Sequence, residues 1–474
     1  MVPIISRRGR YRCGAVLLAL AVVAGTPAAT AAPEDTPGAP PVPVQPALPF
    51  PIPPLPPEFD SQFYSPPPEV VAGKQPGQII AAREVHLAFY SVIPLNIDAW
   101  QLSYRSTNTR DEPIAAVTTV MKPRGDDGGR PRPLLSYQFP EDANAQYCAP
   151  SYSLQQASIP GNISGQFDIP FEFLLAPLTA LAAGWAVAMP DHEGPNSAFA
   201  AGPLAARIVL DGIRATESFA PMGLTPDTEV GLAGYSGGAI ATGHAAEQHG
   251  SYAPELNIVG AAEGGVPADL KAMINLSNNN LGSGLILSGI LGVAREYPQL
   301  AAYLDQRMNG FGKAIAPIKN SLCLYSAAIF PFMNNKGLID SPGDPLDDPV
   351  PAAVLDTIRM GHAVPDVPMF IYQANPDWIA PVGPVNALVD TYCADPRARV
   401  QYVRDHFSEH ISLEIIGIPR ALLWLADRFA GLPADGCGTH DEGSMALDPR
   451  TWPQWLQTAG AILAGVFQQP IGSR

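Results

Sequence analysis

Short apolar runs recur along the chain and are separated by turn-forming residues. The runs that are typical of buried strands are AAREVHLAFY, AAVTTVMKP, PLLSYQF, WAVAMPD, EVGLAGYS, LNIVGAAEGG, PMFIYQA and ARVQYVRD. The first of them follow one another closely, whereas the later ones alternate with helical stretches such as LAARIVLDGIRATESF. This order predicts an α/β fold with a mostly parallel sheet, flanked by helices, that starts with antiparallel strands.

Residues 270–345 interrupt this alternation of strands and helices. Their runs, which include LGSGLILSGILGVAREYPQLAAYL, are apolar, helical in pattern and broken by glycine. They stand between two strand-like runs, where a cap over the carboxyl ends of the strands would be inserted. We therefore expect a helical cap, or lid, at 270–345 and an α/β catalytic domain built from 58–269 and 346–474. The run LGSGLILSGILGVA is apolar on nearly all faces, so protein or a bound apolar ligand must cover it.

The N-terminal residues have the pattern of a secretory signal peptide. Four arginines precede the apolar run CGAVLLALAVVAG, and ATA at 29–31 offers a small-residue cleavage site. We predict that residues 1–31 are removed and that the mature protein is secreted, either extracellular or associated with the cell wall. No later apolar run is long enough for a transmembrane anchor. Residues 32–57 are rich in proline, which predicts an extended spacer; contact with the cell wall is the alternative interpretation.

Charge and cysteine usage narrow the class of protein. The net charge is −16 and no basic run follows the signal, so we expect no binding to nucleic acid. No pair of histidines has metal-ligand spacing with a carboxylate, so we predict no metal and no other cofactor. Removing the signal leaves Cys148, Cys323, Cys393 and Cys437, an even number that predicts two disulfides in an exported protein. Three pairings are open, and buried free thiols are the alternative.

The stretch GYSGG places Ser236 between glycines. The apolar run before it predicts a buried strand that ends at Gly234, and AIATGHAA after it predicts a helix. A strand, a sharp turn and a helix make the geometry of a nucleophile elbow, which exposes the serine hydroxyl at the helix N-terminus. An ordinary strand-to-helix turn is the alternative, and the context favours the nucleophile.

A serine nucleophile needs an imidazole to take its proton and a carboxylate to orient the imidazole. Asp377 directly follows the strand-like run PMFIYQA, and His410 follows the run ARVQYVR. Both residues therefore stand past the carboxyl end of a strand, in the chain order serine, acid, histidine. Glu263 remains an alternative acid, and His406 an alternative base.

Taken in order, the segments of this chain resemble the secretory lipase family, the group typified by Candida antarctica lipase A, which has bacterial members. The segments are DSQFYSPP, PGQII, SYQFPEDANAQYCAPSY, AMPDHEGPNSAF, GYSGG, GAAEGGVPADL and SEH. The resemblance covers most of the chain from about Phe59 onward. It implies an α/β-hydrolase fold with a helical cap, action on acyl esters, and a catalytic triad of Ser236, Asp377 and His410.

The resemblance also implies that the backbone N–H groups of Asp142 and Gly237 form an oxyanion hole, and it favours the pairings Cys148–Cys323 and Cys393–Cys437. We therefore expect a secreted serine carboxylic-ester hydrolase, a lipase that cleaves triacylglycerol or other acyl esters and contacts the lipid interface through its cap. The alternatives are a short-chain esterase or an acyltransferase with the same triad. A non-catalytic cell-wall interaction protein is the alternative of another class.

Overall fold

A computed structural model describes residues 42–125, 131–158 and 168–472. The predicted signal peptide and the first part of the predicted spacer, residues 32–41, lie outside these ranges. Within the described ranges, no helix is both long and apolar enough to pass through a lipid bilayer.

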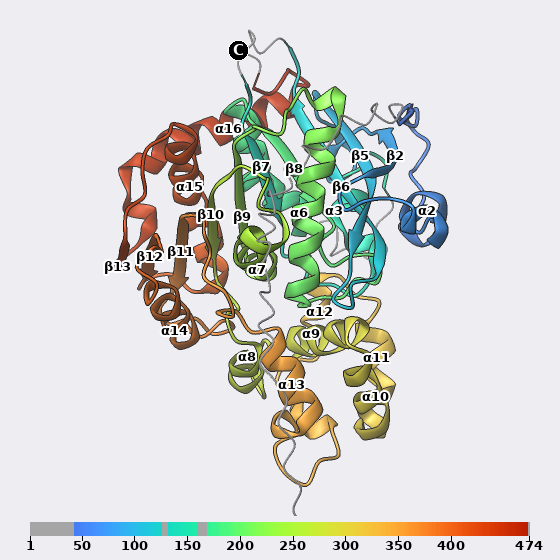
Figure 1. The fold of residues 1–474 in the computed structure, drawn as a ribbon, viewed down its shortest axis with the longest axis vertical. Helices are drawn as coiled ribbons and strands as arrows, with labels where there is room; N and C mark the ends of the chain where they lie inside the picture. The colour runs from blue at the N-terminus through green and yellow to red at the C-terminus, as the bar shows by residue number, and fades with distance from the viewer. Residues whose placement is uncertain (1–41, 126–130, 159–167, 473–474) are drawn as a thin grey trace, which may run out of the picture. The chain divides into compact units, whose positions relative to one another are not determined.

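Most of the described strands form one mixed sheet, in the order β1-β2-β5-β6-β8-β7-β9-β10-β11-β12-β13 (Figure 1). From β8 through β7 to β13 the neighbouring strands run parallel, whereas β2, β5, β6 and β8 pair antiparallel. The predicted mostly parallel sheet with an antiparallel start is confirmed. The strands are β1 Val44–Gln45, β2 Ile79–Glu84, β5 Ile97–Thr107, β6 Pro113–Pro123, β7 Leu134–Gln138, β8 Ala186–Pro190, β9 Val230–Tyr235, β10 Ile258–Gly264, β11 Met369–Ala374, β12 Val400–Asp405 and β13 Cys437–Glu442, and a separate hairpin is formed by β3 Ala88–Phe89 and β4 Ile93–Pro94.

Helices cover both faces of this sheet. Along β9, Leu232 belongs to the apolar core on one face and Ala233 to the core on the other. Because successive side chains of a strand point to opposite faces, a strand covered on both faces reads as a continuous apolar run. The helices of the first face are α6 Gly202–Ser218, α7 Gly237–Tyr252 and α14 Val382–Cys393, and those of the second are α4 Asp168–Leu175, α5 Pro177–Ala182, α15 His410–Phe429 and α16 Trp452–Val466. Three shorter helices are α1 Ser61–Tyr64, α2 Pro68–Ala72 and α3 Pro150–Ser153.

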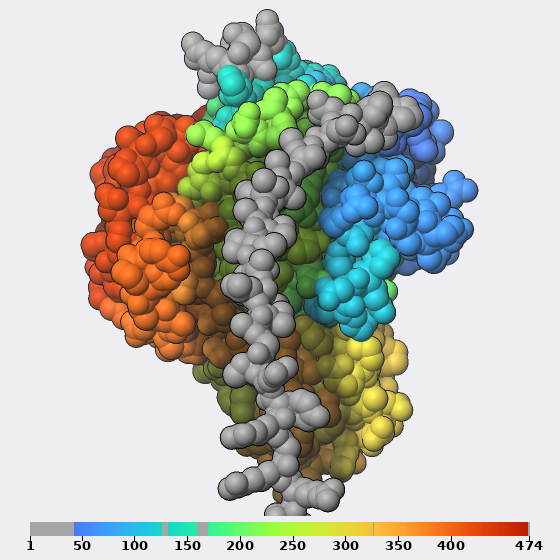
Figure 2. All heavy atoms as spheres, in the orientation of Figure 1, coloured from blue at the N-terminus to red at the C-terminus, as the bar shows by residue number. Residues whose placement is uncertain are grey.

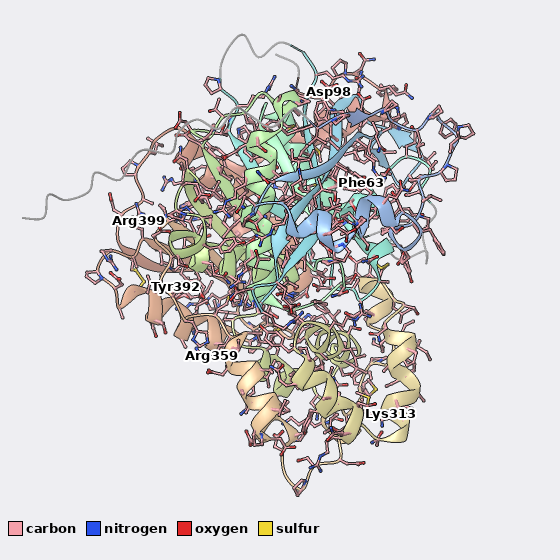
Figure 3. The ribbon with its side chains drawn as sticks, turned by 45° about the vertical axis from the view of Figure 1, so that its right-hand side comes forward. Phe63, Asp98, Lys313, Arg359, Tyr392 and Arg399 are labelled. Atoms are coloured by element: carbon pink, nitrogen blue, oxygen red, sulfur yellow. A yellow bond between two sulfur atoms is a disulfide. The ribbon has the colours of Figure 1, made fainter. Side chains whose placement is uncertain are left out.

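A cluster of helices, the cap, lies at the end of the sheet where the parallel strands finish (Figure 1). Its helices are α8 Leu270–Ser277, α9 Ser283–Glu296, α10 Pro298–Arg307, α11 Gly310–Lys319, α12 Leu324–Ala327 and α13 Pro349–Thr357. In the space-filling view the yellow cap residues pack against the rest of the molecule (Figure 2). Figure 3 shows Lys313 of α11 at the outer edge of the cap, where the side chain is exposed. The last of these helices, α13, packs against α10.

Helix α9 is the centre of the cap and carries the run that is apolar on nearly all faces. Most of its residues are buried, from Ser283 at its start to Glu296 at its end. A Cβ on Gly284 would collide with the Ile329 carbonyl, whereas one on Gly289 would meet Phe199 at an ordinary contact distance of 3.6 Å. Gly284 therefore permits close packing within the cap, and Gly289 leaves space beside it.

The end of the proline-rich segment lies on the sheet edge. Val44 and Gln45, which have prolines on both sides, pair in parallel with Ala82 and Arg83 of β2. Proline cannot donate to a strand ladder, so an edge strand of this length is what such a sequence allows. Part of the predicted spacer thus contributes β1.

Two disulfides connect distant parts of the chain, and both predicted pairings are confirmed. Cys148 bonds to Cys323, which joins the segment after β7 to the cap. Cys393 bonds to Cys437, which joins the end of α14 to the start of β13. The second bond closes a loop of sequence separation 44, worth roughly 4 kcal/mol in the chain-entropy model.

Candidate active site

Ser236 occupies a sharp turn between β9 and α7. Its backbone has φ 50° and ψ −118°, a strained conformation for a residue with a side chain. Glycine is sterically required on both sides, because a Cβ on Gly234 would lie 2.5 Å from the Gly238 carbonyl oxygen, and one on Gly238 would collide with the Gln138 carbonyl. This is the geometry of the predicted nucleophile elbow.

His410 is the first residue of α15, and the backbone on both sides of it is held by acidic side chains. β12 ends at Asp405, whose Oδ1 accepts hydrogen bonds from the backbone N–H groups of Phe407 and Ser408, at 3.0 and 2.8 Å. Glu409 caps the first turn of α15 by accepting two backbone N–H bonds. These contacts fix where the imidazole stands relative to the sheet.

Asp377 lies in the loop after β11 and is buried. Its Oδ1 accepts hydrogen bonds from the backbone N–H groups of Ile379 and Ala380, at 2.9 and 2.8 Å. Its Oδ2 accepts from Gln373 Nε2 at 3.1 Å and from His410 Nδ1 at 2.7 Å. Two amides, one side-chain amide and one imidazole therefore stabilise this carboxylate in a single orientation.

The structure brings the three predicted side chains into one hydrogen-bonded chain. His410 Nδ1 lies 2.7 Å from Asp377 Oδ2, and His410 Nε2 lies 2.9 Å from Ser236 Oγ. With Nδ1–H donating to Asp377, Nε2 is the nitrogen that accepts from the serine hydroxyl. Burial alone would lower the pKa of His410, but the charge and hydrogen bond of Asp377 outweigh it and raise the pKa above 6.5. The imidazole is therefore a strengthened base.

The alternative acid and base lie elsewhere. Glu263 is fully buried in β10, and its carboxyl oxygens have no hydrogen-bond partner among the described residues. Its Oε2 lies against Gly243 of α7, and burial raises its pKa to about 8. His406 is half-exposed and forms an ion pair with Asp441 at 2.8 Å. Neither residue belongs to the series of hydrogen bonds that contains Ser236.

Asp142 and Gly237 present backbone N–H groups beside Ser236. Asp142 has φ 43° in the loop after β7. The amide before it, of Glu141, donates to the Phe139 carbonyl at 2.9 Å. Among the described residues, neither the Asp142 amide nor the Gly237 amide has a hydrogen-bond acceptor. Both residues border the same cavity as Ser236.

Buried carboxyl groups shape this loop, and sequence reasoning missed them. Glu193 Oε1 accepts from the backbone N–H of Ala143 at 3.3 Å, and Glu141 Oε1 accepts from that of His192 at 3.0 Å. The imidazole of His192 donates from Nε2 to the Phe139 carbonyl at 2.7 Å. Burial raises the pKa of Glu141 and of Glu193 well above the usual range. In the sequence, the only sign that carboxyl groups support this loop is the group of charged residues in the segment AMPDHEG.

An apolar cavity extends from Ser236 into the cap. Its empty volume, including its open mouth, is ≈ 960 Å³. Side chains of the cap form most of its wall, among them Ile286, Ile290, Leu300, Leu304, Val354 and Leu355. Such a cavity suits a hydrocarbon chain better than a polar ligand. Across the described part of the chain, no group of three or more histidine, cysteine or acidic side chains is arranged to hold a metal ion.

The comparisons with known proteins decide the family. The model of the family described as secretory lipase matches residues 165–436. The chain belongs to the secretory lipase family. Its membership confirms the predicted α/β-hydrolase fold and the prediction of a serine lipase or carboxylesterase, and it supports secretion.

Relatives of this lipase include bacterial and fungal proteins. A probable inactive lipase of Mycobacterium tuberculosis is 39% identical over 401 residues, which cover 83% of this chain and 87% of the relative. Lipase A of Arthroderma benhamiae is 37% identical over 435 residues, with 89% and 90% coverage. The crystal structure of Candida antarctica lipase A has a TM-score of 0.75 at 31% identity and covers 84% of this chain and 94% of its own.

Proposed function

We propose that this lipase hydrolyses long-chain acyl esters, including triacylglycerol, with Ser236, His410 and Asp377 as its catalytic triad. The observation that carries the proposal is the chain of two hydrogen bonds from Asp377 through His410 to Ser236, at 2.7 and 2.9 Å, on the wall of an apolar cavity. An activated serine supplies the chemistry, and the cavity supplies the preference for an acyl chain.

In the first half of the reaction, His410 Nε2 takes the proton of the Ser236 hydroxyl while Oγ attacks the ester carbonyl. Asp377 keeps the imidazole in the required tautomer and stabilises its charged form. The N–H groups of Asp142 and Gly237 donate to the carbonyl oxygen as it becomes negative, and each such donor is worth about 3 kcal/mol in comparable sites. His410 then gives its proton to the leaving alcohol, and an acyl-enzyme remains.

In the second half, water replaces the alcohol. His410 takes a proton from the water as its oxygen attacks the acyl carbonyl, and it returns this proton to Ser236 when the fatty acid leaves. A panel of p-nitrophenyl esters from acetyl to palmitoyl, together with a fluorophosphonate probe, tests the proposal. We expect labelling of Ser236 and a rise of kcat/KM with chain length. Absence of both labelling and turnover would exclude an activated serine.

Gly289 offers a specific test of the acyl cavity. It lines the cavity, and a Cβ added at this position would meet Phe199 and Ala200 at ordinary contact distances of 3.6 and 3.8 Å. A leucine at this position would fill space that an acyl chain needs and would leave Ser236 and His410 untouched. We expect Gly289→Leu to reduce kcat/KM for a palmitoyl ester about tenfold or more relative to an acetyl ester.

Gly310→Leu is the matched control for this test. Gly310 begins α11 at the outside of the cap, and a Cβ there would meet nothing within 4 Å. The ratio of palmitoyl to acetyl kcat/KM should stay unchanged in this control. An equal loss on both esters in Gly289→Leu, with unchanged thermal unfolding, would show that the acyl chain lies elsewhere.

The apolar rim, which we define as Leu276, Leu281, Phe332 and Ile411, supports contact of this secreted enzyme with a lipid surface. These side chains are 39%, 56%, 63% and 41% exposed. The cap segments on which Leu281 and Phe332 lie are joined by a backbone hydrogen bond from Phe332 to Asn280, at 2.7 Å. The Asn280 side chain donates to the Trp378 carbonyl at 3.4 Å, so the rim adjoins the loop of Asp377. Exposed apolar side chains beside a site are typical of lipid contact.

Polar replacement of the apolar rim should separate interfacial from soluble substrates. We expect Leu281→Ser with Phe332→Ser to lower the hydrolysis of emulsified tributyrin about fivefold or more, since fewer molecules adsorb to the droplets. Hydrolysis of dissolved p-nitrophenyl acetate should stay within a factor of two. Phe311→Ser, an exposed position on α11, serves as the control. Equal rates on the emulsion for all variants would show that the apolar rim does not contact the lipid surface.

A further inference from the structure

The last helix of the chain, α16, has an exposed face that carries no charge. From Trp452 to Gly472 the sequence contains no acidic or basic residue, although the whole chain has a net charge of −16. Five large apolar side chains of this segment are between 46% and 76% exposed, and no described part of the chain covers them. They are Trp452, Leu456, Leu463, Val466 and, directly after the helix, Phe467. An apolar area of this kind on an acidic molecule marks a contact surface.

The exposed residues of this helix are arranged symmetrically about its midpoint. We define the α16 face as the exposed residues between 452 and 467, which in chain order are an aromatic residue, proline, leucine, two small residues, leucine, valine and an aromatic residue. A two-fold axis that is perpendicular to the helix and passes between Ala459 and Gly460 exchanges these residues in pairs of similar size and polarity. The pairs are Trp452 with Phe467, Pro453 with Val466, Leu456 with Leu463, and Ala459 with Gly460.

A self-complementary face of this kind is what two identical molecules need in order to bind through a two-fold axis. In such an interface, residue i of one copy meets residue j of the other, and j meets i. Two antiparallel α16 helices would place Leu456 of each copy level with Leu463 of the other. The small residues at the crossing point would let the helix axes approach closely, and the larger residues on either side would fill the remaining space.

Gly460, at the centre of the α16 face, gives an independent indication of a partner. Glycine within a helix is destabilising relative to alanine, so it is expected where close packing requires it. Gly465 meets this requirement inside the chain, because a Cβ there would lie 2.8 Å from the Phe89 ring. A Cβ on Gly460, in contrast, would meet no described atom within 4 Å. Packing within the described chain does not explain this glycine, whereas the approach of a second helix does.

The position of α16 favours a protein partner over a lipid surface. Figure 1 shows α16 at the end of the molecule away from the cap, so an enzyme whose cap contacts lipid keeps the α16 face in water. A lipid surface would require neither the symmetry of the face nor a glycine at its centre. Two copies with a net charge of −16 repel each other, and an uncharged face keeps like charges out of their contact.

We propose that the α16 face is the interface of a two-fold symmetric homodimer in which the two α16 helices cross antiparallel. At 1.5 Å per residue the face is about 23 Å long. One pair of helices of this length buries less than the roughly 800 Å² per partner of a standard interface, so the dimer dissociates on dilution. The contact leaves the cap of each copy free.

Sedimentation velocity of the mature chain over a range of concentrations tests the proposal. We expect a monomer–dimer equilibrium with a Kd on the order of micromolar. Gly460→Leu should abolish the dimer, because its side chain would occupy the crossing point. Thermal unfolding and the turnover of p-nitrophenyl butyrate should not fall in this variant, since a Cβ there has open space around it. Gly310→Leu, which adds the same side chain at another open glycine, is the matched control and should dimerise like the unaltered chain.

A charge pair tests the antiparallel register. Leu456→Glu and Leu463→Lys, each made alone, should weaken the dimer about tenfold or more, because each places a charge against a leucine of the other copy. When both changes are made in one chain, each introduced carboxylate lies beside the introduced ammonium group of the other copy. The double variant should therefore associate more tightly than either single variant, and less so at high salt. In a parallel pair like charges would meet, and the double variant would associate most weakly.

Three results would overturn the proposal. They are a monomer at every concentration, a Gly460→Leu variant that dimerises like the unaltered chain, and a double variant that associates more weakly than both single variants. Flotation with phosphatidylcholine vesicles tests the other occupant. If the chain is monomeric and Leu456→Glu loses vesicle binding that Phe311→Glu in the cap retains, the α16 face contacts lipid instead. Sedimentation does not depend on ester hydrolysis, so failure of the proposed function would leave this inference standing.

Discussion

Replacing Ser236 with alanine is expected to abolish ester hydrolysis and probe labelling while the protein stays folded. Loss of the nucleophile costs about a millionfold in kcat in well-studied serine hydrolases, because no other group can form the acyl-enzyme. The fold should tolerate alanine, because both residues carry a Cβ at the strained φ of 50°. The measurement is turnover of p-nitrophenyl butyrate by purified protein, with circular dichroism to verify folding.

Ser288→Ala is the matched control for the loss of Ser236. Ser288 lies in α9 of the cap, is fully buried, and its hydroxyl has no hydrogen-bond partner among the described residues. Removing that hydroxyl should leave turnover within a factor of two. Retention of more than a few per cent of activity by Ser236→Ala would contradict the assignment of the nucleophile.

Loss of His410 should be as damaging as loss of Ser236, whereas loss of His406 should be mild. Members of a triad act as a unit, so removing the base leaves only binding and the oxyanion hole, on the order of a thousandfold over water. His406 is four residues away, but its Nε2 pairs with Asp441 at the surface, at 2.8 Å. An exposed pair of this kind contributes about 0–1 kcal/mol.

In the comparison of His410→Ala with His406→Ala each variant controls for the other, because both residues follow β12 within a few positions. We expect kcat/KM to fall by about five orders of magnitude or more for the first and by less than about threefold for the second. In the unaltered enzyme, activity should fall as pH decreases through the raised pKa of His410. If His406→Ala lost more activity than His410→Ala, His406 would be the catalytic base.

The positions of Ser236, Asp377 and His410 were predictable because each follows the carboxyl end of a strand in a parallel sheet. The apolar runs reveal those strands, and the sheet register then brings their ends together, with Gly234 beside Glu263 and Ala374 beside Asp405. The choice of acid also has a physical basis. Glu263 is still within its strand and packs against α7, whereas Asp377 lies past the end of β11.

The groups that support the site were not predictable, because they act across long sequence separations. Glu193 holds the Asp142 loop through an amide that is fifty residues away, and no local pattern encodes that contact. The packing of α13 against α10 is likewise a tertiary contact that no local pattern encodes. The edge strand Val44–Gln45 was not predicted, because the sequence around it is rich in proline and only these two residues pair with β2.

The cap is fastened to the loop that carries Asp142, and this limits how the enzyme opens. The disulfide Cys148–Cys323 crosslinks that region covalently, Asn144 Nδ2 donates to the Ser288 carbonyl of α9 at 2.9 Å, and Arg295 of α9 donates to the Asn144 carbonyl at 2.5 Å. Because of these three connections, the cap cannot move away from the catalytic domain as a separate rigid body at this point. Any force that moves the cap at this point therefore also pulls on the loop that carries the Asp142 amide.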